Sequence, residues 1–133
     1  PSGRTAGDTA GRVAWRVLRA ASYVASPLVY REHIYVVKRG GIISCYVAAT
    51  GKAAWTQRLA GSGDYYASPV AGDGKVYLVS ESGEVTVLAA DSEPRLLGRA
   101  VLEQRCLATP AIAHGRLYVR TESNLYCFSV KSE

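Results

Sequence analysis

The sequence predicts an all-β protein of the propeller type, built from four-stranded antiparallel units. An Ala-Ser/Thr-Pro segment occurs three times, with its proline at Pro27, Pro69 and Pro110. The repeat of about 40 residues is the length of one propeller blade. Thirteen Gly and nine Tyr against one Phe favour turns and strands. With 133 residues, 48% of them hydrophobic and 20% charged, the chain fits one folded domain and excludes wholesale disorder.

Each repeat has the same internal order. Downstream of each proline, an apolar residue followed by Tyr opens a β-rich run, at Ile34 to Val37, Val76 to Val79 and Leu117 to Val119. A turn rich in Gly and polar residues precedes and follows each run. A third strand comes next, at Ile43 to Val47, Val85 to Leu88 and Leu125 to Phe128. Strands joined by tight turns in this way predict an antiparallel meander.

The fourth strand of each blade is less uniform. The first two repeats continue into it at 51–59 and, more degenerately, at 95–102, whereas the third repeat ends before one. Residues 11–19 match 51–59 at Gly, a basic residue, Ala and Trp. We therefore expect a strand at 11–20 to complete the last blade. The expected organisation is a flexible segment at 1–10 and a three-blade unit at 11–133, with blades at about 26–62, 68–103 and 109–130 plus strand 11–20.

These motifs resemble the PQQ-like, or quinoprotein-dehydrogenase-like, propeller repeat. The best local match is the Ala-Thr-Gly-Lys-Ala-Ala-Trp segment at 49–55, and the resemblance covers about residues 11–129. It is similar to BamB-like propellers of the bacterial envelope and to the C-terminal blades of larger bacterial repeat proteins. The resemblance implies inter-blade packing by Trp15 and Trp55. The second repeat lacks this Trp, at Leu96 or Leu97, so we expect its junction to be less rigid.

The number of blades implies a partner. Relatives of this type have roughly six to eight blades, and three twisted sheets leave apolar faces that need neighbours. We expect the ring to be completed by a homo-oligomer, most simply of two chains, or by the remaining blades of a longer protein. The chain contains no Met, so we also expect a processed product or a segment of a longer protein.

The residues give no catalytic pattern. Enzymes of the resembled family use a quinone and Ca²⁺ beside an adjacent Cys pair, which this chain lacks. Asp73 lies in a Gly-Asp-Gly turn, and Cys45 and Cys127 take equivalent apolar positions that favour a core role. There is no Gly-rich phosphate loop, G-x-S-x-G or H-E-x-x-H motif. We predict no catalytic residue, no cofactor, no metal and no enzymatic activity.

A candidate binding surface lies just before the innermost strands. Aromatic and Arg residues are common interface anchors, and the candidates are Tyr23, Asp64, Tyr65, Tyr66, Arg105 and Cys106. The alternative interpretation is that the tyrosines pack the connection between strands. We predict a non-catalytic module for protein binding or scaffolding. The alternatives are a part of a larger quinoprotein-type dehydrogenase or other enzyme, and a piece whose only role is assembly.

Charge and hydropathy limit the classes of partner that we expect for the chain. The net charge is +5, but the basic residues are scattered, which disfavours nucleic acid. No apolar run is long enough to span a bilayer as a helix. The odd number of cysteines, three, leaves the redox compartment open. The resemblance alone implies a periplasmic, envelope-facing or exported protein.

Overall fold

The computed structural model describes residues 12–60 and 63–129, which form three antiparallel sheets and no α-helix. Blade 1 contains β1 (Leu28–Tyr30), β2 (His33–Lys38), β3 (Ile42–Val47) and β4 (Ala53–Arg58). Blade 2 contains β5 (Val70–Gly72), β6 (Lys75–Val79), β7 (Glu84–Ala89) and β8 (Leu96–Val101). Blade 3 contains β9 (Ala111–Ala113), β10 (Arg116–Arg120) and β11 (Leu125–Ser129). Strands follow chain order within each sheet, so the predicted meanders and the all-β fold class are confirmed.

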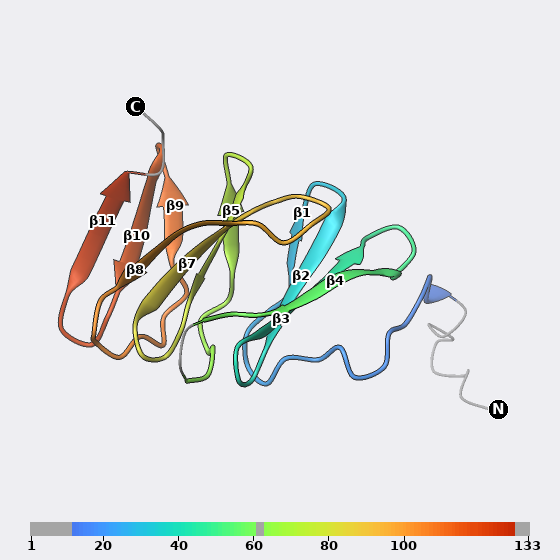
Figure 1. The fold of residues 1–133 in the computed structure, drawn as a ribbon, viewed down its shortest axis with the longest axis horizontal. Coiled ribbons are helices and arrows are strands. Elements are labelled where there is room, and N and C mark those ends of the chain that lie inside the picture. The colour runs from blue at the N-terminus through green and yellow to red at the C-terminus, as the bar shows by residue number, and fades with distance from the viewer. Residues whose placement is uncertain (1–11, 61–62, 130–133) are drawn as a thin grey trace.

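The three blades stand side by side, with blade 1 and blade 3 at opposite ends (Figure 1). The short first strands β1, β5 and β9 contact each other in that order. The repeated Ser/Thr before each proline links them: the Ser26 N–H donates to Ser68 Oγ at 2.8 Å, and the Ser68 N–H donates to Thr109 Oγ1 at 2.9 Å. The hydroxyls of Ser68 and Thr109 therefore join blades 2 and 3 each to the preceding blade, which explains the repeat in physical terms.

The core lies between the blades. One cluster, between blades 1 and 2, includes Tyr35, Ile43 and Leu78, all at most 1% exposed. A second cluster between blades 2 and 3 includes Tyr77 and Leu117. Each sheet therefore buries one face against the next blade, as stacked repeats must do to cover their apolar faces.

The strand predicted at 11–20, which would complete the last blade of the same chain, is not found in residues 12–20. They form no strand and lie against blade 1, at the opposite end from β11 (Figure 1). The Trp15 Nε1–H donates to Ala48 O at 2.9 Å, and the indole covers Gly51 so closely that a Cβ there would lie 2.5 Å from its ring. Because this docking holds the segment on blade 1, it cannot reach blade 3 of the same chain. Residues 1–10 lie outside the described residues.

In blade 2 the position equivalent to Trp55 is not Leu96 or Leu97, as predicted, but another residue of β8. Trp55 on β4 pairs with Cys45 on β3, and the equivalent pair on β7 and β8 is Val87 with Gly98. Gly98, and neither Leu96 nor Leu97, therefore takes the Trp position. Both blades have a register shift at the equivalent place, between Cys45 and Tyr46 and between Val87 and Leu88, so the two registers match and Gly98 aligns with Trp55.

Candidate functional site

Part of the predicted surface lies together at the junction of blades 1 and 2. The rings of Tyr23 and Tyr66 meet edge to face with centroids 6.3 Å apart. The Arg39 guanidinium lies 4.7 Å from the Tyr23 ring centroid, and its Nε is 3.4 Å from Asp64 Oδ2. Asp64 Oδ1 also accepts the Gly40 N–H at 2.9 Å. These contacts join two aromatic rings and an ion pair at an edge where Tyr23 is 63% exposed.

Tyr65 and Cys106 do not belong to an accessible surface. They are 3% and 0% exposed. Burial raises the pKa of the Tyr65 hydroxyl and of the Cys106 thiol, because both charged forms lose their hydration. The Cys106 Sγ–H is directed to the carbonyls of Ala108 and Arg120. Both residues pack the connection into the innermost strand, which was the alternative interpretation for the tyrosines.

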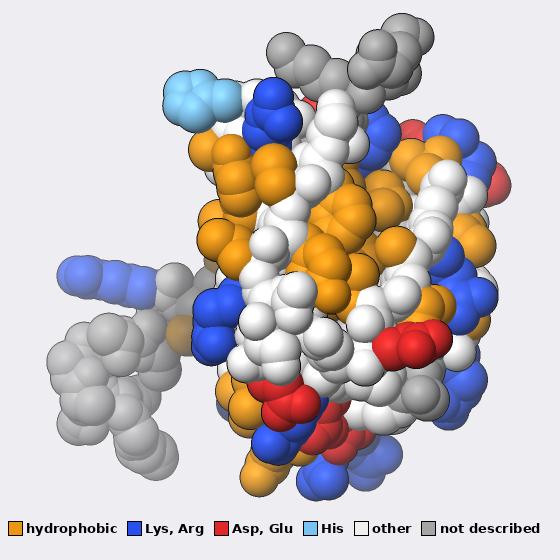
Figure 2. All heavy atoms as spheres, turned by 90° about the vertical axis from the view of Figure 1, so that its left-hand side faces the viewer, with side chains coloured by type: hydrophobic (Ala, Val, Ile, Leu, Met, Phe, Trp, Pro, Cys, Tyr) orange, Lys and Arg blue, Asp and Glu red, His pale blue; other side chains and the backbone are white. Residues whose placement is uncertain are grey.

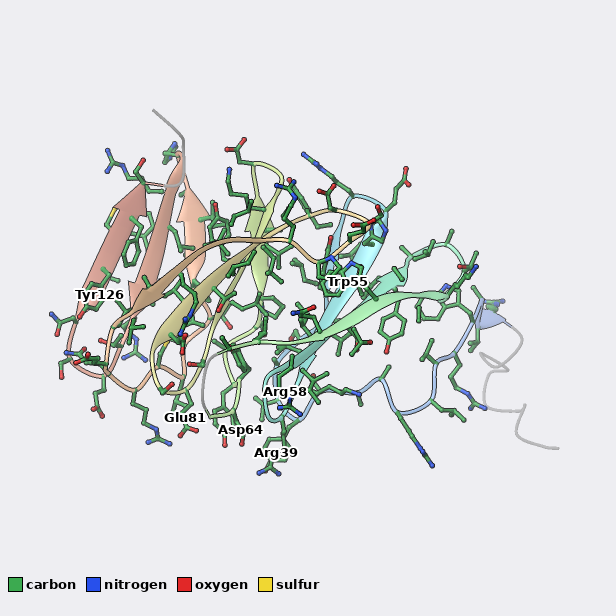
Figure 3. All side chains as sticks on the ribbon, viewed as in Figure 1. Arg39, Trp55, Arg58, Asp64, Glu81 and Tyr126 are labelled. Atoms are coloured by element: carbon green, nitrogen blue, oxygen red, sulfur yellow. The ribbon has the colours of Figure 1, made fainter. Side chains whose placement is uncertain are left out.

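Arg105 lies at the next junction, away from Tyr23. Its Nε is 3.1 Å from Glu81 Oε2, and the following residue donates its backbone N–H to Glu81 O at 2.9 Å. Arg105 and Asp64 take equivalent places in the repeat, as do Glu81 and Arg39. The ion pair is therefore present at both junctions with its polarity reversed. Figure 3 shows Arg39, Asp64 and Glu81 at the same end of the blades.

Because the polarity is reversed, the first junction pairs an Arg of the earlier blade with an Asp, and the second pairs a Glu of the earlier blade with an Arg. Like charges would meet if blade 3 took the place of blade 2 beside Arg39. These exposed pairs add little to stability. It stays a prediction that a partner binds at Tyr23, Asp64, Tyr66 and Arg105.

A second exposed apolar surface, which the sequence did not single out, is the outward face of blade 3. Leu125 pairs with Arg120 just as Ile43 pairs with Val37 and Val85 with Val79. Ile43 and Val85 are 0% and 4% exposed because the next blade covers them, whereas Leu125 is 71% exposed. Figure 2 views this end of the molecule and shows hydrophobic side chains between the backbone strands.

Cys127 lies on the same outward face. It pairs with Tyr118 as Cys45 pairs with Tyr35 in blade 1. Cys45 is buried, as predicted, and burial raises the pKa of its thiol to about 11. Cys127 is exposed, so its predicted core role is wrong for the chain taken alone. The equivalent position is a core position in blade 1.

The opposite end of the stack also has an exposed apolar face. The face of blade 1 that points away from blade 2 includes Val29, which is 64% exposed, and the partly buried Ile34 and Tyr46. Their equivalents in blade 2 are Ala71, Val76 and Leu88, which pack toward blade 1. The two ends of the stack therefore present the two different halves of one blade junction.

The described residues offer no site for the quinone and calcium that the enzymes of the resembled family use. No group of three or more His, Cys, Asp or Glu among the described residues is placed to hold a metal ion. The three cysteines are separate and free. The side chains of the described residues do not fit such a group. Within the described part of the chain, no helix has the length and apolar character needed to cross a membrane.

The fold and its repeated junctions define a propeller-type repeat protein. A family model described as "Outer membrane protein assembly factor BamB" matches residues 39–132. The chain belongs to this BamB-like family of PQQ-type propeller repeats. No curated protein sequence matches the chain.

Solved structures support the fold. BamB from Moraxella catarrhalis has 21% identity and a TM-score of 0.73, over 88% of this chain and 36% of that one. The quinohemoprotein alcohol dehydrogenase ADHIIG from Pseudomonas putida HK5 has 12% identity and a TM-score of 0.67, over 85% and 20% of the two chains. A europium-containing methanol dehydrogenase has 18% identity and a TM-score of 0.51, over 59% and 15%. The chain thus spans about a third or less of each of these proteins. At these identities the likeness concerns the fold alone.

Proposed function

We propose that the chain is a non-catalytic propeller module for protein binding and scaffolding, and that it completes its ring by self-association. The observation that carries the proposal is the open face of blade 3, where Leu125 is 71% exposed at a position that is buried in the other two blades. A contact between the two different ends of neighbouring copies is heterologous, and such contacts form closed rings when the rotation between copies closes. We place the module in the periplasm or cell envelope because its family model bears the name of an outer membrane assembly factor.

The docked N-terminal segment fits this arrangement. Trp55 of β4 reaches forward to blade 2, where its Nε1–H donates to Asp91 O at 3.4 Å. Trp15 reaches blade 1 in the same way. Residues 12–20 therefore lie where the outermost strand of a preceding blade belongs. In a ring, that preceding blade is blade 3 of another copy, whose β11 lacks an outer neighbour among the described residues. The predicted completion of the last blade then takes place between chains.

A cross-chain disulfide tests the arrangement. In blade 1, Ile43 of β3 pairs with Gln57 of β4, and the equivalent residues at the proposed contact are Leu125 and Val17. Directly opposed residues on antiparallel strands are close enough for a disulfide. The double variant Val17→Cys/Leu125→Cys, in a Cys127→Ser background, should form covalently linked chains under mild oxidation, visible on a non-reducing gel.

The two single variants serve as controls, because each should remain as separate chains or form only slow symmetric dimers. Equal amounts of linked product in the single and double variants would contradict the pairing. The alternative function, as a part of a quinoprotein-type enzyme, is favoured only by the fold likeness to the two dehydrogenases. In that case other blades would cover Leu125, and the isolated chain would remain unlinked.

A further inference from the structure

The junction of blades 2 and 3 lacks an aromatic side chain that the junction of blades 1 and 2 contains. In the first junction the Trp55 indole packs on the Tyr35 ring, with centroids 6.1 Å apart and the planes inclined by 58°. In the second junction Tyr77 takes the place of Tyr35, and Gly98 takes the place of Trp55. The ring on the inner strand is present in both junctions, but the indole that covers it is present in only one.

A groove lies where the indole is missing. A Cβ placed on Gly98 would meet no atom within 4 Å. The groove has a volume of about 310 Å³, at the lower end of the range for small-molecule sites. Eight of its eleven lining residues are apolar or glycine, and they come from the facing sheets of blades 2 and 3; they include Tyr77, Val87, Gly98, Leu117 and Phe128.

The charges at the groove are already paired. Lys75 and Arg99 are the only charged lining residues. Lys75 Nζ lies 3.2 Å from Asp73 Oδ2, and Arg99 forms an ion pair with Glu84. A charged ligand would have to compete with these carboxylates or with these cations, at a cost that an apolar groove does not repay. The site therefore favours an uncharged ligand.

We propose that this groove binds a free, neutral, planar bicyclic aromatic molecule of about the size of indole. The internal repeat supplies the template, because the equivalent space beside Tyr35 holds an indole ring of the chain itself. The bound ring would pack on Tyr77 in the inclined geometry that aromatic pairs prefer. Its volume is large enough for such a ring system. This site lies within one chain, so it does not depend on the proposed self-association.

The test uses indole as the probe and the complete chain labelled with ¹⁵N. Titration should give saturable amide shifts that centre on Tyr77, Gly98 and Phe128, with a Kd on the order of 1 mM or tighter. The variant Gly98→Trp should weaken indole binding at least tenfold, because its own side chain takes the space. It should also raise Tm, since the added ring buries apolar area at the junction.

A matched variant controls for the added side chain. Val101→Trp places the same ring on the same strand, at a site that is 58% exposed and outside the groove. It should bind indole as the unmodified chain does. Shifts that scatter over the surface, that do not saturate up to the solubility limit of indole, or that persist unchanged in Gly98→Trp would overturn the proposal. The location of the shifts in the unmodified chain keeps the test decisive even if Gly98→Trp does not fold.

Discussion

Gly83→Ala should destabilise the chain by about 3 kcal/mol or more and lower Tm by roughly 10 °C or more. Gly83 lies in the turn between β6 and β7 with φ at +89°, where a side chain costs about 1–2 kcal/mol. An added Cβ would also lie well inside van der Waals contact of the Gln104 carbonyl oxygen and 3.1 Å from its nitrogen. These are backbone atoms of the segment that enters blade 3, so the turn and the next blade must separate.

Gly40→Ala is the matched control for this prediction. Gly40 lies in the turn between β2 and β3 with φ at +78°, and its nearest neighbour would be Arg58 Nη1 at 3.8 Å. The Gly40→Ala variant has a similar backbone cost but no clash, so we expect its free energy of unfolding to fall by about 1 kcal/mol. Thermal unfolding followed by circular dichroism measures both. Equal losses in the two variants would mean that blades 2 and 3 are not packed as closely at this turn as described.

Leu125→Asp should abolish self-association while it leaves the single chain folded. The side chain is exposed in the single chain, so the substitution costs little there. In the proposed ring the same position is buried as Ile43 is in blade 1. Removal of a buried leucine and burial of a carboxylate together should weaken association about 100-fold or more. Sedimentation velocity over a dilution series measures the change.

The control for this prediction is Val101→Asp. Val101 is 58% exposed on β8, away from both ends of the stack. This variant adds the same charge on an exposed strand, and it should associate as the unmodified chain does. If both variants dissociate equally, or neither does, the outward face of blade 3 is not the contact.

Much of the fold was predictable from the sequence because the repeat encodes specific contacts. The Ser/Thr-Pro segment recurs since the Ser68 and Thr109 hydroxyls each accept a backbone hydrogen bond from the preceding blade. The apolar-Tyr pairs recur since the two side chains face opposite neighbours: Val76 packs toward blade 1, while Tyr77 packs toward blade 3. Alternation along a strand is a local property, so it can be read from the chain.

The candidate site was less predictable because it depends on contacts between distant segments. Tyr65 and Cys106 precede strands in connections that normally lie at the surface, but both pack into the buried clusters between the blades. The strand pairing aligns Gly98 with Trp55, and the degenerate fourth strand of blade 2 does not reveal this register. Leu125 is exposed because blade 3 lies at the end of the stack. Comparison of the third strands with one another could have identified it, since a buried position in two repeats predicts a contact in the third.

The most direct test of the central claim is the solution mass of the unmodified chain, measured by light scattering coupled to size exclusion at micromolar concentration. The single chain is 14.2 kDa. The account predicts a closed assembly, most simply of two chains at about 28 kDa. A single mass of 14.2 kDa across the concentration range would contradict self-association, and it would assign the open faces of blades 1 and 3 to other propeller blades.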